Sequence, residues 1–267
     1  MRLISWNVNG RLARIVEQVA ALVDQNCDFV ALQEVKQNSV PIFRERLQHY
    51  GFHHVADSFE CIADRSLLIG PRRYGELIAS RWPIKRLSAP GCNLPWPERL
   101  LSVAIRSPQG ALQLHTAYIP PGSSNGWRKI ETLEGIYQYL AHQTKTPRIL
   151  CGDFNTPKEE APDGTVVTWH QNLARWDAGE RNILKGLRRF GLSDAFRHQH
   201  GYHLQEFSWY TWTKRGRRFD HVFASPTLLK NADCHYLHSL RVPGLSDHSA
   251  IVFSFDRSER LPQAVTY

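Results

Sequence analysis

Residues 3–10 read LISWNVNG, and residues 29–34 read FVALQE. LISW and FVALQ are short apolar runs with β-branched residues, which is typical of buried strands. Between them, apolar residues recur at helical spacing and predict a helix over residues 14–24. The order strand–helix–strand is that of a βαβ unit, whose chemistry gathers at the carboxyl ends of the parallel strands. The polar residues at these two ends are Asn7 and Glu34.

In the rest of the chain, predicted helices and strands alternate. A strand followed by a turn, as at residues 3–10, occurs again from about residue 147. Helical spacing predicts further helices over residues 41–50 and 127–141, and a short basic helix over residues 183–190. This pattern favours two similar halves that stack their sheets in one domain. The remaining apolar runs predict strands: FHHVA (52–56), SLLIG (66–70), ELIAS (76–80), LLSVAIR (100–106), LQLHTAYI (112–119), PRILC (147–151), FSWYTW (207–212), RRFDHVFAS (217–225) and AIVFSF (250–255).

Composition narrows the class of protein. The 267 residues, 42% of them hydrophobic, suffice for a sizeable core and exclude a disordered chain. We expect one domain over residues 1–256 and a loose tail over residues 257–267. No run approaches a membrane span, and the first residues lack a signal-peptide pattern. The five cysteines form no C-x-x-C pair, which favours a reducing compartment. We therefore expect a cytoplasmic monomer that makes no membrane contact.

Several predicted strands begin or end beside polar side chains that are rarely buried in an apolar core. Carboxylate and amide oxygens are the ligands that Mg²⁺ prefers, and a histidine held by a carboxylate keeps one tautomer and a raised pKa. Phosphodiester cleavage needs an activated water and neutralisation of charge on the phosphate oxygens, which such a set supplies. No G-x-x-x-x-G-K-[ST] phosphate loop is present, which disfavours kinase or ATPase chemistry. The groups are Asn7, Glu34, Asp153, Asn155, Asp220, Asp247 and His248.

The order of these groups resembles the endonuclease/exonuclease/phosphatase superfamily, and most closely its exonuclease III and abasic-site endonuclease branch. The resemblance implies an α/β fold, a four-layered sandwich of two mixed β-sheets face to face with helices outside. The motifs that carry it extend over most of the chain: WNVNG (6–10), LQE (32–34), AYIPPG (117–122), GDFN (152–155), FDHVFAS (219–225) and SDH (246–248).

The resemblance also implies roles for single residues. Glu34 would be the main metal ligand, supported by Asn7 and Asp247. Asp153 would orient or deprotonate the attacking water, and Asn155 would bind a phosphate oxygen. His248, paired with Asp220, would contact the scissile phosphate. The implied metal is Mg²⁺, with Mn²⁺ as a possible substitute.

One strand carries two candidates for a further catalytic group, His115 and Tyr118. Strand alternation places them on opposite faces, so only one reaches the site. The exonuclease III branch has an active-site tyrosine at the position of Tyr118, whereas deoxyribonuclease I-like members carry a second histidine on a comparable strand. We favour Tyr118 and interpret His115 as a satisfied histidine of the sheet.

A basic and aromatic segment precedes Asp220. Cations neutralise phosphates and aromatic rings stack on bases or fill an abasic gap, so this segment is expected to contact DNA, although charge runs often lie on solvated hairpin tips. The branch usually has Trp-Arg-Leu/Ile-Asp where this chain has RRFD (217–220), which weakens the implication of abasic-site specificity. The expected substrate-binding residues are Trp209, Tyr210, Trp212, Lys214, Arg215, Arg217, Arg218 and Phe219.

The leading hypothesis is a Mg²⁺-dependent DNA phosphodiesterase of exonuclease III type, acting at abasic sites or 3′→5′ from DNA ends in DNA repair. The alternative is a phosphodiesterase or phosphatase of the same fold that acts on a small-molecule or lipid phosphoester. A third reading is a non-catalytic binding module, which the complete set of catalytic residue types disfavours.

Overall fold

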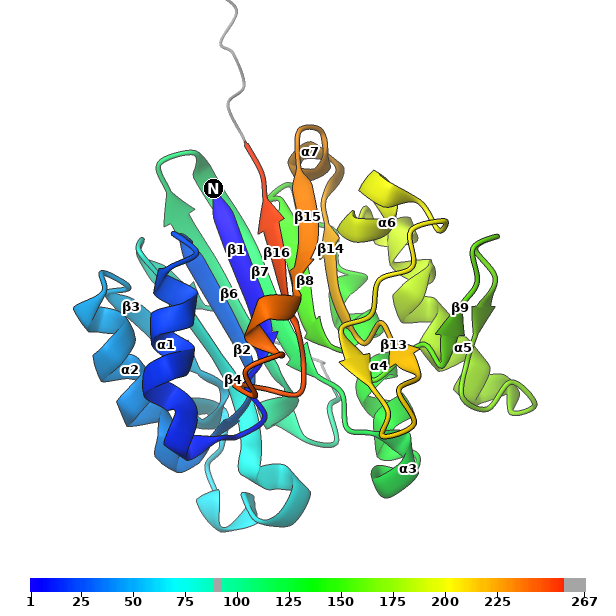
Figure 1. Ribbon diagram of the computed structural model, residues 1–267, viewed down its shortest axis with the longest axis horizontal. Coiled ribbons are helices and arrows are strands. Elements are labelled where there is room, and N and C mark those ends of the chain that lie inside the picture. The colour runs from blue at the N-terminus through cyan, green and yellow to red at the C-terminus, as the bar shows by residue number, and fades with distance from the viewer. Residues whose placement is uncertain (89–92, 257–267) are drawn as a thin grey trace, which may run out of the picture.

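The computed structural model describes residues 1–88 and 93–256, so the tail expected over residues 257–267 lies outside the described residues. Two six-stranded sheets face each other, and helices cover the outer face of each sheet (Figure 1). The four-layered α/β sandwich is therefore confirmed. No helix within these described ranges is long and apolar enough to cross a membrane.

The first sheet contains the βαβ unit predicted from the amino-terminal residues. Strands β1 and β2 are parallel and are joined through α1 (Ile15–Val23), while every other pair in this sheet is antiparallel. The order of the strands is β15 (Asp233–Leu237), β16 (Ala250–Ser254), β1 (Arg2–Asn7), β2 (Phe29–Lys36), β4 (Tyr74–Ser80) and β3 (His54–Asp57).

The second sheet repeats this arrangement. Strands β7 and β8 are parallel and are joined through α3 (Gly122–Asn125) and α4 (Arg128–Leu140), and β14 runs antiparallel beside β8. The order is β11 (Ser193–Asp194), β14 (Asp220–Ala224), β8 (Arg148–Asp153), β7 (Gly110–Tyr118), β6 (Leu100–Ser107) and β5 (Ile84–Arg86). Each sheet thus brings the end of a parallel strand beside the start of an antiparallel one.

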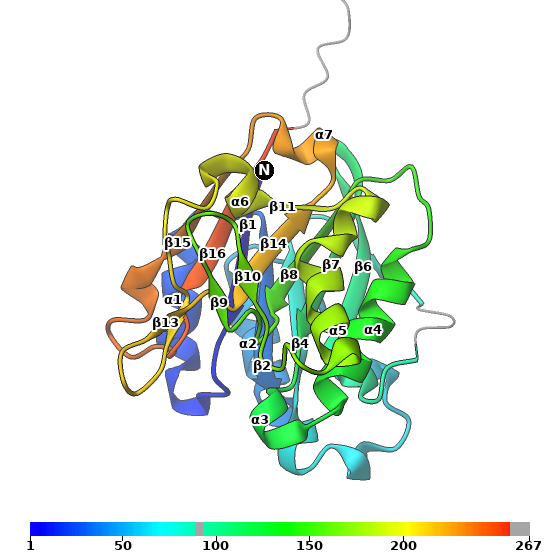
Figure 2. The ribbon, with the colours of Figure 1, turned by 90° about the vertical axis from the view of Figure 1, so that its right-hand side faces the viewer.

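Three apolar clusters hold the four layers together. Leu3 and Leu114 belong to the cluster between the two sheets. Trp6 and Phe43 belong to the cluster between the first sheet and helices α1 and α2 (Val40–His49). Phe154 belongs to the cluster between the second sheet and helices α4 and α5 (Ala174–Leu184), which cover β7 and β8 in Figure 2. Burial of these side chains is the main favourable contribution to folding.

Some predicted elements differ from the observed ones. SLLIG (66–70) is not a strand: it runs from the end of one 3-10 turn, η4 (Arg65–Leu67), to the start of another, η5 (Gly70–Arg73), and pairs with no strand among the described residues. The helix expected over residues 183–190 begins earlier, as α5, and its basic part is the 3-10 turn η7 (Gly186–Phe190). The helices predicted over residues 14–24, 41–50 and 127–141 agree with α1, α2 and α4 to within one residue at each end.

Four short elements lie at the edge of the second sheet. A cluster of buried ion pairs joins the hairpin β9 (Glu159–Glu160) and β10 (Val166–Val167) to β11 and α6 (Ala195–His200). The described residues also form the short helix α7 (Pro226–Leu229) and the hairpin of β12 (Trp209–Tyr210) and β13 (Gly216–Arg217).

The ion pairs of that cluster correct one expectation about Arg218. Its guanidinium donates from Nε to Glu160 Oε2 at 2.6 Å and from Nη2 to Asp194 Oδ2 at 2.8 Å, and only 4% of the residue is exposed. Arg197 donates from Nη2 to the same Glu160 oxygen at 2.8 Å. Arg218 therefore neutralises buried carboxylates and is not available to contact DNA, because a buried charge needs its partners.

The ion pairs of Glu160 make the stability of the fold depend on pH. Burial alone would raise the pKa of Glu160, but Arg218 and Arg197 outweigh it and lower that pKa from 4.5 to about 2. A carboxylate with a depressed pKa stabilises the fold above its unfolded pKa, and that stabilisation is lost as the pH falls through the folded pKa. For Glu160 the contribution is about 3 kcal/mol.

We predict that Glu160→Gln, which keeps the shape and removes the charge, unfolds at lower urea concentration than the wild type near neutral pH. The gap in free energy of unfolding should shrink between about pH 5 and pH 2, as the wild-type carboxyl becomes protonated. Glu131→Gln is the matched control, since Glu131 pairs with Arg128 on a partly exposed helix face and should matter by less than about 1 kcal/mol. A gap for Glu160→Gln that is unchanged down to about pH 2 would contradict the role of its charge.

Candidate active site

The polar residues singled out in the sequence meet at one edge of the sandwich because of strand direction. Asn7 ends β1 and Asp153 ends β8, so each lies at the carboxyl end of a parallel strand, one in each sheet. Asp220 begins the antiparallel strand β14 and is the register partner of Asp153. His248 precedes β16, which pairs antiparallel with β1. Residues far apart in the sequence are thereby brought to the seam between the two sheets.

Asn7 links the carboxylates of the two sheets. Its side-chain Nδ2 donates to Glu34 Oε1 and to Asp153 Oδ2, both at 2.9 Å. Its Oδ1 accepts a hydrogen bond from the backbone N–H of Asn9 at 2.9 Å. Asn7 is fully buried, so these bonds fix its amide and the separation of the two acids.

The backbone around Glu34 is shaped by an irregularity in β2. The register with β4 shifts between Leu32 and Val35, and Glu34 has a φ of +56°. A non-glycine residue adopts this left-handed conformation uncommonly, and a bulge re-aims a side chain relative to the regular strand. Here the carboxylate turns to Asn7 and also shares a hydrogen bond with the Tyr118 side chain. Glu34 is only half-buried, so it can reach a ligand from solvent.

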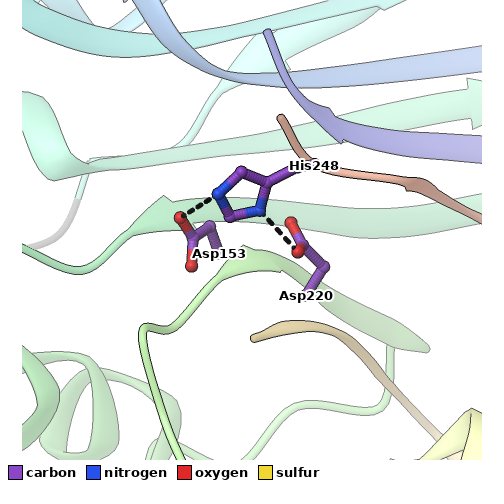
Figure 3. A group of neighbouring side chains, drawn as sticks. All are labelled: Asp153, Asp220 and His248. Carbon is purple, nitrogen blue, oxygen red and sulfur yellow. Dashed lines mark hydrogen bonds and ion pairs between the residues drawn. The ribbon is translucent and has the colours of Figure 1, made fainter. Parts of the chain in front are cut away.

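His248 lies between two carboxylates, as Figure 3 shows. Its Nδ1 lies 2.8 Å from Asp220 Oδ2, and its Nε2 lies 3.8 Å from Asp153 Oδ2. Burial alone would lower the pKa of His248, but Asp220 and Asp153 outweigh it and raise that pKa to about 10. At neutral pH the imidazole is therefore protonated and donates to Asp220, with its second N–H directed at Asp153.

Asp153 is the acid with the most perturbed pKa in this group. Only 1% of it is exposed, and burial raises its pKa to about 7 in spite of the facing His248. Its Oδ1 accepts the backbone N–H of Asn155 at 3.0 Å. Asn155 in turn has a φ of +49°, and its Nδ2 donates to the carbonyl oxygen of Ile119 at 2.9 Å. The turn after β8 thus places an amide side chain directly beside a carboxylate that titrates near neutral pH.

The glycine of GDFN allows this close approach. Gly152 has a φ of +135°, and a Cβ built on it would lie 2.0 Å from the carbonyl oxygen of Ala117 in the neighbouring strand. A side chain at this position would push β7 and β8 apart, which would move Tyr118 and Asp153 relative to each other.

The two candidates on β7 lie on opposite sides of the sheet. His115 is 1% exposed, its Nδ1 lies 2.8 Å from Ser102 Oγ, and its ring contacts Tyr139 of α4. Burial lowers its pKa to about 3, so it stays neutral. Tyr118 instead lies beside Glu34, with the guanidinium of Arg99 4.4 Å from its ring centre. Of the two, only Tyr118 reaches the carboxylate site.

The donors at this edge suit a hard divalent cation. One ligating atom each from Asp153, Asp220 and His248 lie within 4.8 Å of one another, and Asp220 Oδ1 is buried without a hydrogen-bond partner in the described residues. His248 lies between Asp153 and Asp220, and the half-buried Glu34 is the acid beside them that an ion can reach from solvent. Carboxylate and amide oxygens are the ligands that Mg²⁺ and Mn²⁺ favour, so the residues fit such an ion.

Asp247 and the aromatic segment form the rim of the site. Asp247 is exposed, and its Oδ2 accepts a hydrogen bond from Trp209 Nε1 at 3.1 Å. Trp209 stacks on the buried Phe219 with ring centres 5.4 Å apart, and its ring centre lies 6.4 Å from that of His248. These rings therefore border the histidine.

The other residues expected to bind substrate lie farther along the hairpin. Tyr210 contacts the guanidinium of Arg241, 4.3 Å from its ring centre. At the tip, Trp212 is 93% exposed, and Lys214 and Arg215 are exposed beside it. Arg217, on β13, is half-buried.

Sequence reasoning missed two groups that adjoin the site. Glu76 of β4 is fully buried, and burial raises its pKa well above the usual range. Trp169 donates from Nε1 to the carbonyl oxygen of Asn155 at 3.1 Å. Neither belongs to a motif: Glu76 lies inside a predicted strand, and Trp169 lies in a polar loop. Only the burial of Glu76 and the packing of that loop identify them.

Known proteins share both the sequence and the fold. The model of the Endonuclease/Exonuclease/phosphatase family matches residues 4–248. Exodeoxyribonuclease III of Haemophilus influenzae is 26% identical over 253 residues, which cover 85% of this chain and 89% of that protein. An exodeoxyribonuclease of Bacillus subtilis is 25% identical over 244 residues, with the same coverage of 85% and 89%.

Solved structures agree with the architecture. An AP endonuclease from Archaeoglobus fulgidus superposes with a TM-score of 0.75 at 23% identity, covering 96% of this chain and 99% of that one. The 3′ phosphatase NExo from Neisseria, bound to product DNA hairpin, has a TM-score of 0.69 at 22% identity, covering 96% and 99%. The family match runs from β1 to the histidine that faces Asp153 and Asp220. This chain belongs to the endonuclease/exonuclease/phosphatase family, a family of phosphoester hydrolases.

Proposed function

We propose that this protein is a Mg²⁺-dependent DNA phosphodiesterase of exonuclease III type, acting at abasic sites or 3′→5′ from DNA ends. The observation that carries this proposal is the geometry of His248, whose Nδ1 is held by Asp220 at 2.8 Å and whose Nε2 is directed at the buried Asp153 beside Asn155. The named exodeoxyribonuclease relatives support DNA as the substrate.

Each group has a chemical task in this proposal. Asp153 accepts a proton from the attacking water, because its pKa of about 7 lets it take up a proton near neutral pH. The His248 imidazolium donates a hydrogen bond to a non-bridging phosphate oxygen, whose negative charge grows in the transition state. Asn155 binds a second phosphate oxygen, and Asp220 keeps His248 charged and oriented. The Tyr118 side chain, which shares a hydrogen bond with Glu34, would face the phosphate from the Glu34 side.

Glu34 would hold the metal ion together with Asn7 and Asp247. Bound there, the ion supplies positive charge that neutralises the phosphate. Asn7 already fixes the distance between Glu34 and Asp153, so it also keeps the acid that binds the ion apart from the acid that accepts the proton. Exposed Lys214 and Arg215 extend positive charge along the rim for the neighbouring phosphates of a polyanion.

We predict that Asp153→Asn lowers kcat on a duplex with a recessed 3′ end, and on an abasic duplex, by about 100-fold or more, because the amide cannot accept the proton. The amide can accept only one of the two hydrogen bonds that the Asp153 oxygens receive from Asn7 and Asn155, so the melting temperature is measured as well, to show that the variant is folded under the assay conditions. Asp163→Asn, in the exposed loop between β9 and β10, is the control and should cleave like the wild type. Full activity of Asp153→Asn on both duplexes would remove Asp153 from the mechanism.

We predict that Glu34→Gln raises the Mg²⁺ concentration needed for half-maximal cleavage by at least about tenfold, since a neutral amide replaces a charged ligand. The matched control is Glu17→Gln, whose carboxylate pairs with Arg14 on the exposed face of α1. The Mg²⁺ titration, repeated with Mn²⁺, measures the effect, and chelator should abolish wild-type cleavage. An unchanged Mg²⁺ midpoint in Glu34→Gln would place the ion elsewhere.

We predict that Lys214→Ala reduces the dependence of DNA binding on salt. A cation that neutralises one phosphate contributes about 0.9 to the slope of log K against log salt, and that slope should fall by this amount. Arg189→Ala on the exposed turn η7 is the control, with no change in slope. If neither binding nor cleavage by the wild type changed with salt concentration, a small phosphoester would be favoured as the substrate.

A further inference from the structure

Trp169 is fixed beside the proposed phosphate-binding residue Asn155. It lies between β10 and α5, and its indole Nε1 donates to the Asn155 carbonyl oxygen at 3.1 Å. At its other end, the backbone N–H of Trp169 donates to Glu180 Oε2 at 3.1 Å. The ring is therefore held at two points and has one orientation relative to Asn155.

A buried ion pair supports this arrangement from behind. Lys129 and Glu180 are 1% and 0% exposed, and their charged groups are 2.5 Å apart. Lys129 Nζ donates at 2.9 Å to the same Asn155 carbonyl oxygen that Trp169 uses. Glu180 also accepts the Thr156 hydroxyl at 2.8 Å. The turn after β8 and the indole thus rest on one rigid support, because a buried pair with satisfied hydrogen bonds resists displacement.

The indole lies in a group of aromatic rings and one guanidinium. Trp169 is 37% exposed, and its ring centre lies 6.4 Å from that of Phe219, which Trp209 stacks on from another side. The guanidinium of Arg217 lies 5.8 Å from the Trp169 ring centre. We call Trp169, Phe219, Trp209 and Arg217 the aromatic wall. Phe219 is only 4% exposed and packs against the two indoles, so the accessible part of the aromatic wall is Trp169, Trp209 and Arg217. Two flat rings and a cation match a nucleotide, which has a flat base and a negative phosphate.

We propose that Trp169 is a base-stacking residue that gives the site a preference for a nucleotide carrying its base next to the scissile phosphate. This inference rests on the proposed function, because it assumes a DNA phosphate at Asn155. The indole is bonded to the backbone of Asn155 itself, so the nucleoside attached to that phosphate is the part of the substrate nearest to the ring. Arg217 contacts the phosphate on the other side of that nucleoside. An abasic residue has no base to stack and gains nothing from Trp169.

The test is a double-mutant cycle in which one change is made in the protein and the other in the substrate. Wild type and Trp169→Ala are assayed on duplexes whose nucleotide beside the cleaved bond carries its base or is a base-free tetrahydrofuran residue, placed on either side of the bond. Loss of one stacked base corresponds to about 5- to 100-fold in kcat/KM. We expect this loss for Trp169→Ala on the base-carrying duplex and little loss on the matching base-free duplex, which is a coupling between ring and base.

Two further variants separate stacking from support of Asn155. Trp169→Phe loses the hydrogen bond to Asn155 but keeps an aromatic face, and it should retain most of the preference for the base. Tyr50→Ala is the control: Tyr50 is 42% exposed and its ring contacts His49 at the end of α2, and it should not change the preference.

The outcomes distinguish base stacking, support of Asn155 and absence of DNA cleavage. Equal losses on base-carrying and base-free duplexes for both Trp169 variants would mean that the ring only positions Asn155, which overturns base stacking. A wild type that cleaves neither duplex overturns the proposed DNA activity itself and the inference with it. Cleavage by the wild type, together with a base-dependent loss in Trp169→Ala alone, supports both.

Discussion

The side-chain amide of Asn7 is the contact on which the rest of the site depends. It spans the seam between the sheets, with one hydrogen bond to Glu34 of its own sheet and one to Asp153 of the opposite sheet. The charges of the half-buried Glu34 and the buried Asp153 repel each other, and the charge of Glu34 contributes to the raised pKa of Asp153. The shared amide sets their separation without adding charge. His248 faces the charge of Asp153 from the other side. The positions of the remaining groups of the site are therefore set relative to the Asn7 bridge.

Much of this site follows from the sequence because strand ends are local features. Asn7, Asp153 and Asp220 border apolar runs whose length and composition already predict buried strands, and parallel or antiparallel pairing brings such borders together. Alternation along β7 was also sufficient to separate His115 from Tyr118, which the structure places on opposite sides. The four-layered architecture came from the motif resemblance, since periodicity alone does not count layers.

The remainder depends on partners that are distant in the chain. Arg218 reads as one cation in a basic run, but Glu160 and Asp194, which neutralise it, lie 58 and 24 residues away. SLLIG has the composition of a strand, yet no neighbouring strand offers it hydrogen bonds, so it forms turns. Trp169 is likewise defined by Glu180 and Asn155, neither of which its local sequence indicates.

The position of the strands in the chain also determines when the enzyme can first act. Asn7 lies on the first strand, and His248 stands just before the last strand of its sheet, with β16 paired directly to β1. A chain emerging from the ribosome therefore lacks its imidazolium until almost the whole domain has been synthesised and both of its ends have paired. A partly folded or truncated molecule carries Asn7 and Asp153 without His248 and without strand β16, so its site is incomplete. The topology thus completes the site only when β16 has paired with β1.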